Sequence, residues 1–125
     1  MTTVMLVDDS PTMLMSIRGV LTKAGLGVET AGDGKEALDR VVGGLKPDLI
    51  ISDVNMPRMD GITFVREVRK APGMRFVPIL MLTTESEQTK RTEAKAAGAT
   101  GWLVKPVQGP DLLGVIRQVV PGVTC

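Results

Sequence analysis

Histidine is absent from this chain of 125 residues, and cysteine occurs once, as Cys125 at the very end. Without histidine the chain has no imidazole to act as a general acid or base, and it cannot build a histidine triad or a histidine-ligated metal site. A single terminal cysteine cannot form an internal disulfide. These absences exclude several common kinds of catalytic and structural site.

Long apolar runs and an excess of charge of one sign are also missing. The apolar runs are far shorter than a membrane-spanning helix requires, and the N-terminus lacks the pattern of a signal peptide. The 15 basic and 14 acidic residues nearly balance, so no broad basic surface for nucleic acid or anionic lipid is expected. We therefore expect a cytoplasmic protein that neither binds nucleic acid nor inserts into a membrane.

The composition is that of one folded domain. Apolar residues make up 43% of the chain and charged residues 23%, which is typical of a globular protein. The length fits one ordinary domain with one core, and no linker or low-complexity tract interrupts it. We predict a single domain over residues 1–125.

Short apolar runs alternate with helical patterns along the whole chain. The apolar runs predict strands at residues 4–7, 26–31, 49–53, 77–82 and 100–104. The helical patterns predict helices at residues 11–24, 35–42, 62–69, 87–97 and 111–120. Strands joined by helical crossovers must be parallel, and strands buried on both faces read as continuous apolar runs. The sequence therefore predicts a doubly wound α/β fold with a five-stranded parallel sheet.

Polar residues stand where four of the predicted strands end: Asp8, Asp9, Asp53, Thr83, Thr84 and Lys105. Each has an ordinary interpretation by itself, as a solvated loop residue, a helix cap or a surface lysine. Ligands of doubly wound sheets bind beyond the carboxyl ends of the strands. The arrival of these side chains at that one edge favours a site over separate surface residues.

One chemistry explains these residue types together. Clustered carboxylates repel one another and favour a cation, and oxygen ligands suit Mg²⁺, with Mn²⁺ as an alternative. A carboxylate beside such a metal can attack phosphorus and form an aspartyl-phosphate. The charge on the transferred phosphoryl group can then be shared by the metal, a lysine and a hydroxyl.

The chain resembles the receiver domain of two-component response regulators, most closely the single-domain chemotaxis type (CheY-like). The matching segments are Val7-Asp8-Asp9-Ser10, Asp53-Val54-Asn55-Met56-Pro57 with Asp60-Gly61, Thr83-Thr84-Glu85, Gly98-Ala99 and Lys105-Pro106. Together they extend over essentially the whole chain. The resemblance implies a flavodoxin-like fold with strand order 2-1-3-4-5.

The resemblance also implies a role for each site residue. Asp53 would be the phosphoacceptor, and Mg²⁺ would be bound by Asp8, Asp9, Asp53 and the backbone carbonyl of Asn55. The phosphoryl group would contact Thr83 and Lys105, and the switch would consist of Thr83 and Trp102. Asn55 and Glu85 would tune dephosphorylation, while Pro57, Gly61 and Pro106 would shape the loops.

Three positions depart from the family pattern. Trp102 stands where the family usually has tyrosine or phenylalanine, and Thr84 where a small residue is common. The tryptophan would either rotate inward on phosphorylation or remain partly exposed. The run Met13-Leu14-Met15 lacks the arginine that chemotaxis regulators often have after the methionine, and Met13 and Met15 would fill the core or form a docking surface for the kinase.

By resemblance, the phosphodonor is the phosphohistidine of a CheA-like histidine kinase phosphotransfer domain. The expected output is a binding event by a monomer that is not an enzyme, on a face around Lys90, Arg91, Lys95, Trp102 and Gln108. Its target in chemotaxis would be the flagellar motor switch protein; a phosphate sink or another pathway is the alternative, and a phosphatase is a further partner. A haloacid-dehalogenase-like phosphatase is a remote alternative, because its motif needs an aspartate where this chain has Asn55.

Overall fold

The computed structural model describes residues 2–56, 58–83, 88–105 and 107–120. The expectations for Pro57, Thr84, Glu85, Pro106 and Cys125 fall outside these residues. The strands are β1 (Thr3–Val7), β2 (Gly27–Ala31), β3 (Leu49–Asp53), β4 (Ile79–Thr83) and β5 (Gly101–Val104). The helices are α1 (Pro11–Lys23), α2 (Gly34–Val42), α3 (Gly61–Lys70), α4 (Gln88–Ala97) and α5 (Gly109–Val119).

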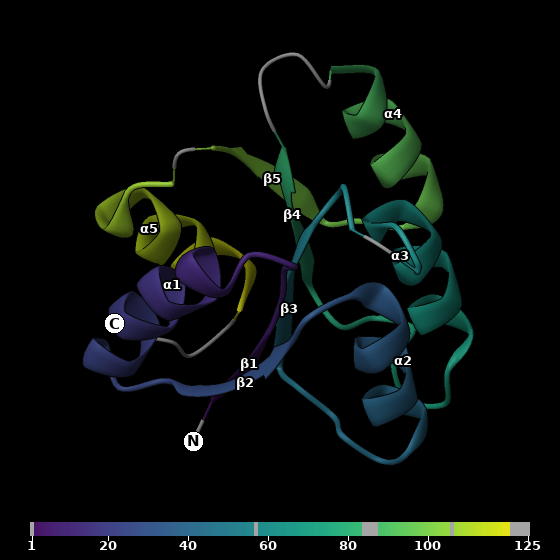
Figure 1. Ribbon diagram of the computed structural model, residues 1–125, viewed down its shortest axis with the longest axis horizontal. Coiled ribbons are helices and arrows are strands. Elements are labelled where there is room, and N and C mark those ends of the chain that lie inside the picture. Colours follow the sequence, from purple (N-terminus) through teal and green to yellow (C-terminus); the bar gives the residue numbers. More distant parts are fainter. Residues whose placement is uncertain (1, 57, 84–87, 106, 121–125) are drawn as a thin grey trace.

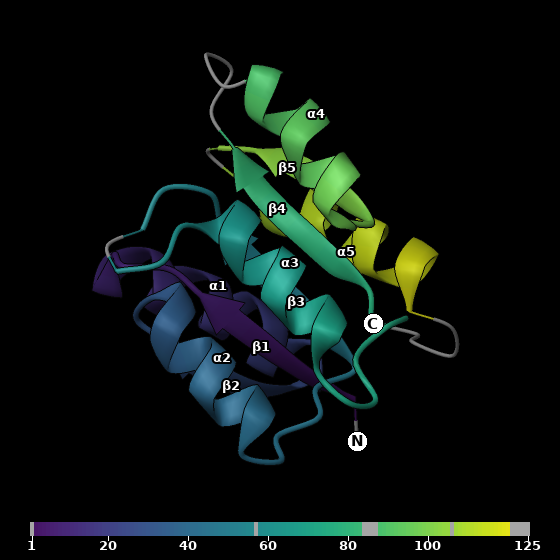
Figure 2. The same ribbon diagram turned by 90° about the vertical axis from the view of Figure 1, so that its right-hand side faces the viewer.

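The five strands form one parallel sheet in the order β2-β1-β3-β4-β5. Helices α1 and α5 cover one face of the sheet, and α2, α3 and α4 cover the other (Figure 1). Figure 2 shows the second of these helical layers from its outer side. The predicted flavodoxin-like fold and its strand order are therefore confirmed.

The sheet separates two hydrophobic cores. Alternate residues of one strand face opposite layers: Met5 and Val7 pack with Phe64 of α3, whereas Val4 and Leu6 pack with Leu21 of α1. All residues of β3 and β4 are buried: the apolar runs at residues 49–51 and 79–82, as the sequence predicts, and also the polar Ser52, Asp53 and Thr83 at the strand ends. Among the described residues, no helix has the length and apolar character needed to cross a bilayer.

Side-chain caps fix where α1 and α3 begin, in the loops that follow β1 and β3. The Ser10 hydroxyl accepts a hydrogen bond from the Met13 N–H at 3.3 Å at the start of α1. The Asp60 carboxylate accepts from the Thr63 N–H at 2.9 Å at the start of α3. Such caps satisfy backbone donors that a helix start leaves open. They hold each strand–helix loop close to the edge of the sheet where the polar residues lie.

Two predicted boundaries were wrong by two residues. Strand β4 begins at Ile79 rather than Val77, and Pro78 before it has no N–H to donate to a neighbouring strand. Helix α5 begins at Gly109 rather than Asp111, with Pro110 in its first turn, where the ring geometry suits a helix.

The Arg69 side chain of α3 links the loop before β4 to the loop before β5. Its Nε and Nη2 donate to the Gly98 carbonyl at 3.1 and 2.7 Å, and its Nη1 donates to the carbonyls of Met74 and Val77 at 3.1 and 2.6 Å. Burial lowers the pKa of Arg69 from its ordinary value. The residue acts as a structural clamp at the end of the molecule opposite the polar site.

Candidate functional site

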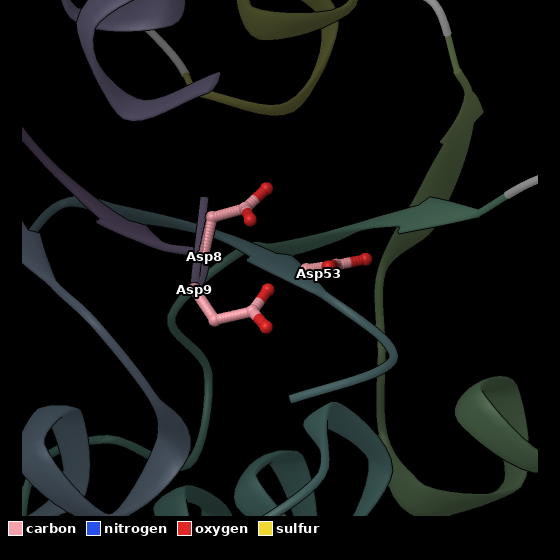
Figure 3. Close-up of side chains that lie close together, drawn as sticks. All are labelled: Asp8, Asp9 and Asp53. Atoms are coloured by element: carbon pink, nitrogen blue, oxygen red, sulfur yellow. The ribbon is translucent and has the colours of Figure 1, made fainter. Parts of the chain in front are cut away.

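Three carboxylates meet at the carboxyl edge of the sheet (Figure 3). Asp8 and Asp9 directly follow β1, and Asp53 is the last residue of β3. One oxygen from each lies within 4.8 Å of the others; Asp8 and Asp53 are buried and Asp9 is exposed. Because β1 and β3 are parallel neighbours, their ends bring residues 45 positions apart in sequence to the same place.

Lys105 supplies the positive charge in this cluster. Its Nζ lies 3.0 Å from Asp53 Oδ1 and 3.7 Å from Asp8 Oδ2. Its backbone N–H donates to the Thr83 carbonyl at 2.7 Å, which extends the pairing of β4 and β5 by one hydrogen bond. The ammonium group therefore reaches the carboxylates from a strand end that is itself hydrogen-bonded to the neighbouring strand.

Asp53 lies in an environment that disfavours its charge. Burial raises the pKa of Asp53 above its ordinary value; Lys105 acts against this shift, and the charge of Asp8 adds to it. The Asp53 Oδ1 also accepts from the Val54 N–H at 2.8 Å. The Lys105 ammonium and the Val54 amide thus do not fully compensate the cost of burying the charged Asp53 carboxylate.

The side chain of Asp8 tests whether a metal fits. Its Oδ1 accepts from the Ser10 N–H at 2.9 Å, whereas its Oδ2 is buried and has no hydrogen-bond partner among the described residues. The Lys105 ammonium, at 3.7 Å, is too far away to donate a hydrogen bond to it, and a buried carboxylate oxygen that accepts no hydrogen bond is costly. A hard divalent cation that takes carboxylate oxygens as ligands would satisfy it, so the donor set fits Mg²⁺.

Thr83 and Trp102 lie on the neighbouring strands β4 and β5. Thr83 is fully buried, and its Oγ1 has no hydrogen-bond partner in the described part of the chain. Trp102 is 41% exposed, and the guanidinium carbon of Arg91 lies 5.6 Å from the centre of its ring. Of the two arrangements that the sequence left open, this structure contains the partly exposed one.

Gly61 closes the loop that follows Asp53. Its N–H donates to the Val54 carbonyl at 2.8 Å, and a Cβ at this position would lie 2.1 Å from the Asp53 carbonyl oxygen. Only glycine fits there without a backbone shift. Asn55 lies in the same loop, two residues after Asp53, and its side chain is exposed.

Other predicted residues lie further from the cluster. Met13 is half-buried against the α1–α5 core, whereas Met15 is 75% exposed on α1. Lys90, Arg91 and Lys95 lie on α4. The two alternatives for the methionines therefore separate: Met13 fills the edge of the core, and Met15 is available to a partner.

Sequence reasoning missed one ion pair next to this region. Arg58 donates two hydrogen bonds to Asp33, although 25 positions separate them. Asp33 reads in the sequence only as part of a turn before a helix, and Arg58 as a loop residue. No periodicity or spacing indicates that they meet.

The profile of the response regulator receiver domain matches residues 4–117. The sensor histidine kinase CheAY of Helicobacter pylori is 35% identical over 118 residues, which are 94% of this chain and only 15% of that kinase. The solved structure of the Vibrio cholerae chemotaxis response regulator CheY4 is 49% identical with a TM-score of 0.89, over 95% of this chain and 98% of that one.

The receiver domain of the sensor histidine kinase PA1611 from Pseudomonas aeruginosa is a third similar structure. It is 29% identical with a TM-score of 0.87, over 95% of this chain and 97% of that one. That structure has a magnesium ion coordinated in its active site cleft.

Proposed function

Because this chain belongs to the response regulator receiver domain family, we propose that it accepts a phosphoryl group on Asp53 from the phosphohistidine of a histidine kinase. Receiver domains are phosphoacceptor signalling modules and not classical enzymes, and the triad of Asp8, Asp9 and Asp53 is typical of their Mg²⁺ site. The same family membership argues against the haloacid-dehalogenase alternative. We treat residues 1–125 as one such domain, monomeric and cytoplasmic.

The observation that carries the proposal is the placement of the Asp53 carboxylate between Lys105 and the acidic pair. Its Oδ1 already accepts from Lys105 and from the Val54 N–H, so we assign Oδ2 as the attacking oxygen. A bond forms between Oδ2 and phosphorus while the bond between phosphorus and the donor nitrogen breaks. The imidazole leaves with that electron pair and a proton from solvent.

The remaining groups stabilise the charge of the phosphoryl group. The Lys105 ammonium lies close enough to Asp53 to bind one oxygen of the incoming phosphoryl group. The Thr83 hydroxyl, which has no hydrogen-bond partner among the described residues, can donate a hydrogen bond to another. When bound by Asp8, Asp9, Asp53 and the Asn55 carbonyl, Mg²⁺ would supply positive charge to the phosphoryl oxygens. Glu85 and Asn55 are proposed to influence the water that later attacks phosphorus.

A small phosphodonor tests this assignment. The protein is incubated with acetyl phosphate and Mg²⁺, and its intact mass is measured. We expect one phosphoryl adduct that survives acid and is lost in base, its absence from Asp53→Ala, and its presence in Asp39→Ala, a control that removes an exposed aspartate of α2. A wild-type protein without the adduct, or an equal adduct in Asp53→Ala, would refute the proposal.

The output is proposed to be a protein-binding event on the face formed by α4, β5 and α5. A groove of about 440 Å³ there is lined by Arg91, Thr92, Lys95 and Trp102. Its two cations and one aromatic ring suit an acidic segment of a partner. The similarity to CheY4 supports chemotaxis, with the flagellar motor switch protein as target; a phosphate sink is the alternative, and a phosphatase is a further proposed partner.

Two measurements separate these outputs. Trp102 is the single tryptophan, so its fluorescence reports on this face directly. A motor-switch regulator should bind its target more tightly, with changed emission, when beryllofluoride mimics the phosphoryl group. Emission and affinity that ignore the mimic would contradict a switch at Trp102 and favour a phosphate sink.

A further inference from the structure

The loop between β3 and α3 is fastened at two places. At its base, the Gly61 N–H donates to the Val54 carbonyl at 2.8 Å. Further along, Arg58 reaches to Asp33 at the start of α2. Asn55, whose backbone carbonyl is the proposed fourth protein ligand of the metal, lies between these two fastening points in the sequence.

The ion pair between Arg58 and Asp33 is bidentate. Arg58 Nε lies 2.8 Å from Asp33 Oδ2, and Arg58 Nη2 lies 3.1 Å from Oδ1. The same Oδ1 accepts from the Glu36 N–H at 2.8 Å, so Asp33 also caps α2. A two-point contact fixes orientation as well as distance. The loop is therefore held to a helix end that is itself well defined.

Arg58 has an unfavourable backbone conformation in this arrangement. Its φ is 64°, and it is the one non-glycine residue among those described with a positive φ. Residues with a Cβ adopt this region at a cost, and they keep it only where surrounding contacts compensate. The two hydrogen bonds to Asp33 are such contacts.

Gly34 adds a steric contact to the same junction. A Cβ at position 34 would lie 2.7 Å from the Met59 carbonyl oxygen and 3.1 Å from Met59 Cγ. The residue after Arg58 therefore packs directly on the residue after Asp33. The ionic and the steric contact together press one side of the loop onto the start of α2.

We propose that Asp33 and Arg58 are positioning residues for the divalent cation. They strengthen the binding of the ion without touching it, because they hold the loop that carries Asn55. This inference rests on the proposed function, because it assumes a cation beside Asp53. A loop that is not fastened must be ordered when the ion binds, and that ordering reduces the affinity. The pair removes this requirement in advance.

Charge alone makes a different prediction from positioning. Loss of the Arg58 cation would strengthen the binding of Mg²⁺ by simple electrostatics, and loss of the Asp33 anion would weaken it. Positioning requires both losses to weaken binding. Two variants isolate the effect: Arg58→Gly permits the positive φ, and Asp33→Asn keeps a side-chain oxygen that can cap α2.

The experiment measures Mg²⁺ affinity by the shifts of backbone amides in NMR titrations, together with hydrogen exchange of the loop amides. We expect each variant to bind Mg²⁺ up to about fivefold more weakly, which is the range of an exposed ion pair. The double variant should be no weaker than either single one, and loop exchange should rise in all three. Lys70→Met and Glu67→Gln, which break an exposed pair at 3.0 Å on α3, should change neither.

The outcomes are distinguishable. Tighter binding in Arg58→Gly with weaker binding in Asp33→Asn, or additive effects in the double variant, would overturn the positioning role and leave the proposed function intact. Unchanged affinity and exchange in both variants would overturn it as well. A wild-type protein whose amides near Asp8, Asp9 and Asp53 ignore Mg²⁺ would overturn this inference and the proposed cofactor together.

Discussion

Replacing Lys105 by methionine should destabilise the metal-free protein and make its stability depend more strongly on Mg²⁺. The substitution keeps an aliphatic chain of similar length but removes the cation that lies 3.0 Å from Asp53 and 3.7 Å from Asp8. Both carboxylates stay behind in a largely buried place. Removal of one partner from such a group is costly, because the other charge is left without compensation.

The size of the effect follows from these contacts. A hydrogen bond to a charged group contributes about 1.5–3 kcal/mol net, and the longer contact with Asp8 adds a smaller electrostatic contribution. The Lys105 side chain is 23% exposed, so water replaces part of what is lost. We expect the free energy of unfolding to fall by about 2 kcal/mol, which lowers the urea midpoint by roughly 1 M.

The pH dependence has a definite sign. Lys105 acts to lower the pKa of Asp53 against the larger effect of burial, so its loss raises the folded-state pKa further. The folded variant then holds the Asp53 proton more tightly than the unfolded chain does. Its stability therefore falls as the pH rises through the folded-state pKa, and the difference from wild type is full at neutral pH and shrinks on acidification.

Urea denaturation at neutral and mildly acidic pH, with and without Mg²⁺, measures all three effects. Mg²⁺ at ten times its Kd adds about 1.4 kcal/mol to a protein that binds it only when folded. The gain should be larger in Lys105→Met, since the ammonium no longer repels the ion. Lys35→Met, in an exposed pair on α2, should cost no more than about 0.5 kcal/mol. A variant as stable as wild type without Mg²⁺, or a difference that widens on acidification, would refute this reasoning.

Further predictions concern Asp53, the loop that follows it and the Arg69 clamp of α3. In Mg²⁺-free buffer, Asp53→Asn should raise the free energy of unfolding at neutral pH but not in acid. Burial raises the pKa of Asp53, so only the charged form of its carboxyl group is penalised in the folded state. Equal gains at both pH values would contradict this. Gly61→Ala should lower the free energy of unfolding by about 2 kcal/mol or more and slow adduct formation, because its Cβ would lie 2.1 Å from the Asp53 carbonyl oxygen. The control Gly19→Ala, whose Cβ would have no atom within 4 Å, should not destabilise the protein in urea. Arg69→Ala should cost about 3 kcal/mol because three carbonyls lose a charged donor, and the exposed Arg66→Ala on the same helix should stay within about 0.5 kcal/mol; similar urea midpoints for the two would be inconsistent with the clamp.

The sheet and the carboxylate cluster could be predicted because they depend on rules that act along the chain. The buried parallel strands β3 and β4 begin with apolar runs, residues 49–51 and 79–82, and these runs identify them in the sequence. Parallel strands end at one edge, so polar residues placed directly after them must meet there. The meeting of Asp8, Asp9 and Asp53 follows from these two rules without knowledge of any side-chain conformation.

Contacts between surface side chains could not be predicted in this way. Arg69 reads as one more charged residue on α3, yet its guanidinium group donates to two carbonyls of the loop before β4 and to a third, 29 residues away, in the loop before β5. The side chain of Trp102 is partly exposed and the guanidinium group of Arg91 from α4 lies over its ring, and neither feature follows from the sequence of β5. Such contacts depend on the relative placement of elements, which leaves no local pattern in the sequence.

The position of β5 at the edge of the sheet has a consequence for how signals can travel. In the described part of the chain this strand pairs with β4 alone, and it carries the exposed ring of Trp102, with Lys105 one residue beyond its end. A protein that binds the Trp102 ring therefore contacts the same short segment of backbone that positions the Lys105 ammonium group beside Asp53. If phosphorylation changes the binding free energy of a partner, thermodynamic reciprocity requires that partner binding change the free energy of phosphorylation by the same amount. The affinity for a partner and the stability of the phosphorylated state would thus be coupled through the short segment from Trp102 to Lys105.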